Sequence, residues 1–137
     1  MENGMPVYKP EDVVRDELRN RLGLDNPSTK QSGVGQLYTF RQLGFTDKLI
    51  SSKKPDGWFL PKNNYEVAII CETKNSNEPV EKNTNQLEEY IEIVKSKYNK
   101  VIGIIYNGCD VLVYKNNEII ETVSTCLLYT SPSPRDS

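Results

Sequence analysis

The sequence contains no histidine among its 137 residues. Without an imidazole, the chain has no Ser-His or Cys-His hydrolase site, no His-ligated zinc site and no His-based nuclease site. Any hydrolytic chemistry in this protein therefore has to rest on carboxylates, lysines and a metal ion.

Long apolar runs and a cysteine framework are also lacking. No apolar run approaches the length of a membrane span, and no secretory signal pattern follows Met1, so we expect no membrane partner. The cysteines Cys71, Cys109 and Cys126 are odd in number and widely spaced, which predicts neither a disulfide framework nor a zinc site and fits a cytoplasmic protein. The net charge of −2 gives no global sign of nucleic-acid binding, although basic residues can still gather locally.

Chain length and composition predict one soluble, ordered domain, because 36% of the residues are hydrophobic and 26% are charged. We assign residues 1–125 to this domain. Residues 126–137 differ in character: most of this stretch resembles the translation of a sequencing adapter, and the alternative is a Ser/Pro-rich disordered end. We therefore expect the natural protein to continue past about Thr125, with this chain as its N-terminal fragment.

A β-hairpin is predicted between Asp56 and Glu72. Its strands are residues 56–60 and 66–72, joined by a turn at 62–64, and the apolar run in the second strand suits a buried central position. The short turn places Asp56 directly opposite Glu72. Since side chains alternate along a strand, Lys74 shares a face with Glu72, and the three side chains are expected to converge at one end of the hairpin.

Two carboxylates that face each other across a strand pair repel one another, so we expect a cation between Asp56 and Glu72. Carboxylate oxygens are ligands that Mg²⁺ prefers, and Lys74 adds a positive donor beside them. This set of groups suits phosphodiester hydrolysis, in which a metal polarises the phosphate and a lysine orients or deprotonates the attacking water. The alternative is a solvated strand end with an ordinary salt bridge.

Pro55-Asp56 followed by Glu72-Thr73-Lys74 resembles the motif of the PD-(D/E)xK nuclease superfamily. The chain contains no other Pro-Asp pair and no other Asp/Glu-x-Lys triplet. The resemblance implies catalytic roles for Asp56, Glu72 and Lys74. It also implies a Mg²⁺ ion, with Mn²⁺ as a substitute, held by Asp56, Glu72 and the backbone carbonyl of Thr73.

A first helix is predicted to start near Pro10 and to end at Gly23, with Val14, Leu18 and Leu22 as its apolar stripe. Glu11 falls in the middle of this stripe, where a carboxylate needs a partner. Nucleases of this superfamily often take a further metal ligand from the first helix, so Glu11 is the candidate; the alternative is a solvated residue that favours the helix dipole. Arg15 and Arg19 lie on other faces, as surface charges or phosphate contacts.

A second helix is predicted from a cap at Asn83 or Thr84 to about Tyr98. Gln86 and Tyr90 lie one turn apart on it. Gln-x-x-x-Tyr after Glu-x-Lys resembles a motif of RecB-like nucleases and of type I restriction subunits, which implies that this pair contacts DNA. Because Tyr90 also lies on the apolar stripe, core packing is its alternative role.

Two lysines precede the hairpin. Lys53 and Lys54 are candidates for contacts with a DNA backbone, and a solvated turn is the alternative.

The remaining elements complete a fold-class prediction. Residues 25–36 are predicted as a loop, 37–45 as a strand or short helix, and 101–106 as a buried strand; Asn107-Gly108 and Asn116-Asn117 then turn the chain through two added strands. The order resembles the α-β-β-β-α-β core of the superfamily, with residues 37–45 as its first strand. We expect an α/β fold with a restriction-endonuclease-like core, in which helices flank a central mixed β-sheet.

The resemblance implies a Mg²⁺-dependent DNA endonuclease domain of a restriction-modification system. It is closest to the N-terminal nuclease domain of type I restriction enzyme R subunits or of fused restriction-modification enzymes. Expected partners are double-stranded DNA and methyltransferase, motor or specificity parts. The alternatives are a RecB-like or junction resolvase-like nuclease of DNA repair and recombination, an RNA substrate, and a catalytically silent DNA-binding module of the same fold.

Overall fold

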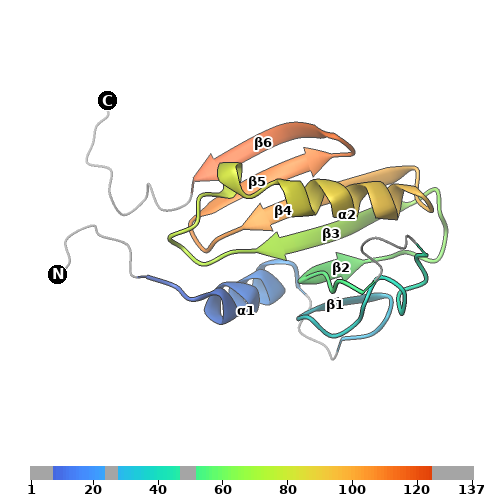
Figure 1. Cartoon of the computed structure of the whole chain (residues 1–137), viewed down its shortest axis with the longest axis horizontal. Helices are drawn as coiled ribbons and strands as arrows, with labels where there is room; N and C mark the ends of the chain where they lie inside the picture. Colours follow the sequence, from blue (N-terminus) through green and yellow to red (C-terminus); the bar gives the residue numbers. More distant parts are fainter. Residues whose placement is uncertain (1–7, 24–27, 47–51, 125–137) are drawn as a thin grey trace.

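The computed structural model describes residues 8–23, 28–46 and 52–124, and the tail at 126–137 lies outside them. These residues form an α/β fold with one six-stranded sheet and two α-helices (Figure 1). In chain order the elements are α1 (Glu11–Arg21), β1 (Ser32–Val34), β2 (Gly57–Phe59), β3 (Val67–Thr73), the short 3₁₀ helix η1 (Val80–Lys82), α2 (Asn85–Lys95), β4 (Lys100–Tyr106), β5 (Asp110–Lys115) and β6 (Glu118–Ser124).

The sheet is mixed, as the sequence predicts. Its strands lie side by side in chain order from β1 to β6, and only β3 and β4 run parallel. Parallel neighbours need a crossover connection, and α2 supplies it between β3 and β4. The strands β5 and β6 extend the sheet beyond this unit as antiparallel additions.

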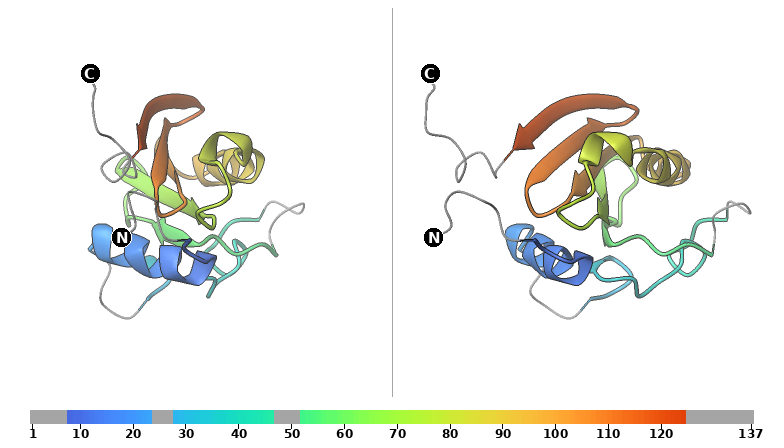
Figure 2. Two further views of the ribbon diagram at one scale, coloured as in Figure 1. Left: turned by 90° about the vertical axis from the view of Figure 1, so that its left-hand side faces the viewer. Right: turned by 60° about the vertical axis from the view of Figure 1, so that its left-hand side comes forward.

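The two helices cover opposite faces of the sheet (Figure 2). The apolar stripe of α2 packs on one face, in the larger of two buried clusters. This helix lies very close to β4, because a Cβ atom built on Gly103 would stand 2.5 Å from Cδ1 of Ile91. On the other face, Val14 and Leu18 of α1 pack against Cys71 and Tyr106. Each helix thus fixes one side of β3.

The predicted hairpin and its register are confirmed. In the pair of β2 and β3, Gly57 lies opposite Cys71, and the next two pairs follow in the same register. Continued by one residue, that register sets Asp56 opposite Glu72. The strand β3 is the buried central strand that its apolar run indicates, since Ala68 and residues 70–73 are buried.

The predicted first strand is wrong. Residues 37–45 form turns in which Phe40 and Phe45 are buried, and the first strand is β1, within the predicted loop at 25–36. The glycines of this segment favour a loop in the sequence pattern, but glycine within a strand also permits close packing. A Cβ on Gly33 would stand 2.9 Å from the Trp58 ring and 2.4 Å from the Ser28 hydroxyl oxygen.

Both helices form where the sequence predicts them, with shorter ends. In α1, Pro10 is the N-cap residue and the helix ends two residues before Gly23, whose φ of 72° suits a helix C-terminus. In α2, Thr84 is the N-cap residue and the helix ends at Lys95 rather than Tyr98. The polar connection before α2 contains η1, which buried Val80 anchors to the core.

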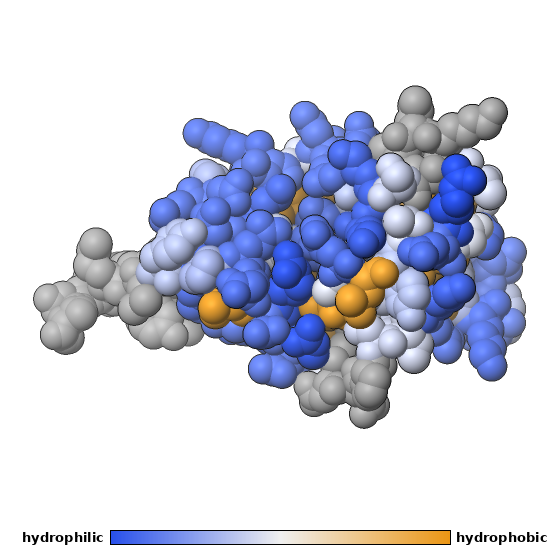
Figure 3. All heavy atoms as spheres, turned by 60° about the horizontal axis from the view of Figure 1, so that its bottom comes forward, coloured by the Kyte–Doolittle hydropathy of each residue, from blue (hydrophilic) through white to orange (hydrophobic). Residues whose placement is uncertain are grey.

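Within the described ranges, no helix combines the length and the apolar character needed to cross a membrane. The face drawn in Figure 3 is mostly hydrophilic, with a few separate hydrophobic patches. Cys71 is a buried free thiol.

Candidate functional site

Asp56 is held where β2 begins beside the end of β3, and it is fully buried. Its backbone N–H donates to the carbonyl of Cys71 at 3.2 Å, and its own carbonyl accepts from the N–H of Gly35 at 2.7 Å. The backbone of Asp56 is therefore tied to β3 on one side and to the end of β1 on the other.

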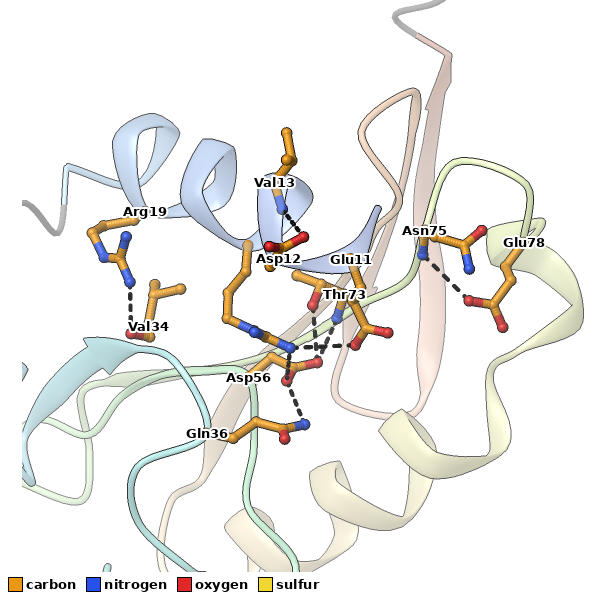
Figure 4. Close-up of polar contacts among 11 residues, drawn as sticks. Glu11, Asp12, Val13, Arg19, Val34, Gln36, Asp56, Thr73, Asn75 and Glu78 are labelled. Carbon is orange, nitrogen blue, oxygen red and sulfur yellow. Dashed lines mark hydrogen bonds and ion pairs between the residues drawn. The ribbon is translucent and has the colours of Figure 1, made fainter. Parts of the chain in front are cut away.

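The carboxylate of Asp56 has three hydrogen-bond donors (Figure 4). Oδ2 accepts from the backbone N–H of Thr73 at 2.8 Å and from the Thr73 hydroxyl at 3.0 Å. Oδ1 accepts from the side-chain amide of Gln36 at 2.8 Å. These donors fix the orientation of the carboxylate at the end of the sheet.

Glu72 is the second buried carboxyl, with 4% of its surface exposed. Its Oε2 atom is buried and has no hydrogen-bond partner. Burial, together with the charge of Asp56, raises the pKa of Glu72 to about 9, while Lys74 acts in the opposite direction. A buried polar atom without a partner costs free energy, so a cation or a hydrogen-bond donor beside Oε2 of Glu72 would stabilise it.

Two further predicted residues lie within electrostatic reach of this pair. Lys74 directly follows β3, and its backbone N–H donates to the carbonyl of Tyr106 at 3.0 Å. Glu11, in the first turn of α1, keeps 40% of its side chain exposed. Burial and the charge of Asp56 raise the pKa of Glu11, whereas Arg15 and Lys74 lower it.

The structure thus brings four predicted residues to one end of the sheet: Glu11, Asp56, Glu72 and Lys74. Over the described part of the chain, no group of three or more acidic or cysteine side chains is close enough to form a metal centre by itself. A cation site here would start from the buried pair, Asp56 and Glu72.

Sequence reasoning missed two residues of the site. The Nη2 atom of Arg15 lies 3.6 Å from Oδ1 of Asp56 and 3.5 Å from Oε2 of Glu11. The spacing of four residues between Glu11 and Arg15 was the available signal, since it places both on one helix surface. Gln36 gave no signal, because it belongs to a polar segment whose path depends on β1.

A groove lined with lysines lies beside the acidic pair. Its first part has a volume of about 290 Å³ and is lined by Gln36, Lys53, Lys54, Gln86 and Tyr90. The second part, of about 180 Å³, shares Gln86 and is lined also by Lys74, Lys82, Asn83 and Asn85. We call these two parts the lysine groove; it contains all four residues that the sequence assigned to DNA contacts.

Tyr90 has the core-packing role considered for it, and it also lines the lysine groove. It is 1% exposed, and its ring packs against Phe40 with a centroid distance of 4.7 Å, so it is a core residue. It also lines the lysine groove, and burial together with the charges of Glu72 and Asp56 raises the pKa of its hydroxyl. Tyr90 therefore connects the hydrophobic core with the edge of the site.

The chain has no match among family models, curated proteins or solved structures. A buried acidic pair suits a divalent cation, and a groove with four lysines suits a polyanionic ligand.

Proposed function

We propose that this protein is a Mg²⁺-dependent DNA endonuclease domain with a restriction-endonuclease-like core. The observation that carries the proposal is the buried, unpartnered Oε2 of Glu72 beside the buried carboxylate of Asp56. The order of elements from α1 to β4 and the register of β2 on β3 support it, because they place the Pro-Asp and Glu-x-Lys segments together.

The residues present fit a divalent cation. Glu72 offers an oxygen that lacks a partner, and Asp56 offers a second carboxylate in a fixed orientation. Asp56, Glu72 and the backbone carbonyl of Thr73 would hold Mg²⁺ or Mn²⁺, with Glu11 as a further candidate ligand. When bound, such a cation supplies polarisation of the phosphate and a lower pKa for a coordinated water.

The chain's own residues perform the remaining tasks. Lys74 orients the attacking water or accepts its proton, since it follows Glu72 by two residues and faces the same end of the sheet. Thr73 and Gln36 keep the Asp56 carboxylate in place. Lys53 and Lys54 attract the phosphates of the substrate, while Gln86 and Tyr90 position it.

The proposed substrate is double-stranded DNA, and the proposed setting is a restriction-modification system in the cytoplasm. Methyltransferase, motor or specificity parts would then act together with this domain. The lysine groove supports a nucleic-acid partner, because it gathers positive charge next to the acidic pair in a chain whose net charge is −2.

A second candidate function has its own support. The guanidinium of Arg15 already lies near Asp56 and Glu11. A protein cation in this place suits a catalytically silent module that binds DNA without cleaving it.

Plasmid cleavage with and without Mg²⁺ separates these candidates. The wild-type chain is compared with the Asp56→Ala and Glu72→Gln variants, and cation binding is measured in parallel by titration calorimetry. Mg²⁺-dependent cleavage that both substitutions abolish supports the nuclease. Equal nicking by wild type and Asp56→Ala removes the catalytic assignment, and DNA binding without cation binding or cleavage favours the silent module.

A further inference from the structure

We propose that Arg15 is a resident cation that competes with a divalent metal ion for Asp56 and Glu11. This inference deepens the proposed function and rests on the metal site described there. It assigns Arg15 the role of a positioning residue that sets the affinity of the site for its cation.

The geometry shows a weakly held guanidinium. One nitrogen, Nη2, serves both carboxylates, at 3.5 Å from Glu11 and 3.6 Å from Asp56. Charge-assisted hydrogen bonds are commonly about 2.7–2.9 Å long, and strong Arg–carboxylate pairs use two nitrogens. Arg15 therefore offsets part of the charge of the two carboxylates, without the short, paired contacts of a permanent ion pair.

The rest of the Arg15 side chain does not use all of its hydrogen-bond donors. Its Nε atom is buried and has no partner, while 22% of the side chain is exposed. Arg19, one turn further along α1, provides a contrast. It bonds Oδ1 of Asp16 at 2.8 Å and the carbonyl of Val34 at 3.2 Å, as expected for a structural arginine.

Asp56 does not need Arg15 to stay in place, because Thr73 and Gln36 donate to both of its oxygens. A divalent cation bound by Asp56 would stand within a few ångströms of the guanidinium. Two positive charges at that distance repel each other, because a protein screens charges less than bulk water does. Arg15 must therefore leave the pair when the cation binds, or the site binds the cation more weakly.

The test measures Mn²⁺ binding to the full chain by electron paramagnetic resonance. It compares wild type with Arg15→Ala and with Arg19→Ala, the matched control on the same helix. We expect the Kd of Arg15→Ala to be lower by about tenfold or more, since one adjacent like charge is removed. We expect the Kd of Arg19→Ala to stay within about twofold of wild type. In the double variant Asp56→Ala/Arg15→Ala, the gain in Mn²⁺ affinity should disappear.

The outcomes separate this inference from the proposed function. If wild type binds Mn²⁺ through Asp56 but Arg15→Ala has an unchanged or higher Kd, the inference is overturned and the metal site stands. If wild type and Asp56→Ala bind Mn²⁺ with the same Kd, or if wild type, Asp56→Ala and Arg15→Ala all fail to bind it, both proposals are overturned. Arg15→Gln, which keeps the length of the side chain without its charge, replaces the alanine variant if circular dichroism shows that the latter is unfolded.

Discussion

Thr73 donates twice to a single oxygen of Asp56, through its backbone N–H at 2.8 Å and its hydroxyl at 3.0 Å. The contact joins the last residue of β3 to the residue that precedes β2. Because Asp56 is fully buried and Thr73 is 1% exposed, both bonds form away from water. The middle residue of Glu-x-Lys therefore orients the Asp of Pro-Asp, which links the two halves of the motif.

Replacing Thr73 by valine should destabilise the protein, because the substitution keeps the shape of the side chain and removes one donor to a buried carboxylate. We expect a loss of about 1.5–3 kcal/mol in the free energy of unfolding, the usual range for hydrogen bonds to charged groups. Urea unfolding with a chelator present measures it. Thr73→Ser, which keeps the hydroxyl, is the control and should retain most of the stability; equal unfolding midpoints for all three proteins would contradict this account.

The raised pKa of Glu72 predicts how stability depends on pH in the metal-free protein. The folded-state pKa of about 9 exceeds the ordinary value of 4.5, so between these values the folded chain binds a proton that the unfolded chain lacks. Stability should therefore fall as pH rises through this window, by at most about 1.4 kcal/mol per pH unit. Urea unfolding at pH 6 and pH 8.5 in the presence of a chelator measures the fall.

Two variants isolate the contribution of Glu72. Glu72→Gln removes the titrating group, so the slope with pH should largely disappear. Glu121→Gln changes an exposed residue of β6 and should keep the wild-type slope. A wild-type slope in Glu72→Gln would show that other groups cause the pH dependence.

The sequence predicted the β2–β3 hairpin well because its information is local. A single apolar strand, a short turn and the period of two along a strand determine which residues face each other. The register of Gly57 opposite Cys71 is the one derived from the turn. The parallel pairing of β3 with β4 also follows from a helix between two apolar strands.

The sequence failed where tertiary contacts decide the structure. The strand β1 consists of three residues with a glycine at its centre, and it forms because Gly33 accommodates the ring of Trp58. No periodicity can identify so short a strand. The role of Arg15 in the site was missed for the same reason. A helical pattern gives the face on which a residue lies, whereas the direction of a long side chain depends on charges from other elements, here Asp56.

The lysine groove predicts which basic residues bind DNA. Replacing Lys53 and Lys54 by alanine should weaken DNA binding and reduce the dependence of log Kd on log salt by about 1–2 units, since each phosphate contact contributes about 0.9 for duplex DNA. Fluorescence anisotropy with a DNA duplex, repeated at several salt concentrations, measures both effects.

The matched control also removes two lysine charges, but at positions outside the lysine groove. Lys62 and Lys100 lie at the opposite end of β3 from Asp56 and Glu72, and both are exposed. The Lys62→Ala/Lys100→Ala variant should keep the wild-type salt slope. If both double variants lose affinity equally, binding depends on overall charge rather than on the groove.

Lys74 should affect the chemical step rather than the binding of DNA or of the metal ion. Proton transfer by a positioned side chain contributes roughly 10²–10⁴-fold to a rate, so Lys74→Met should lower the single-turnover cleavage rate by about that factor. Lys82→Met is the control, because Lys82 lines the same part of the lysine groove but lies on η1, away from Glu72 in the chain. It should weaken DNA binding slightly and leave the rate at saturating DNA unchanged. Equal losses of rate in the two variants would mean that Lys74 only attracts phosphate, and the attacking water would then need another group to orient it.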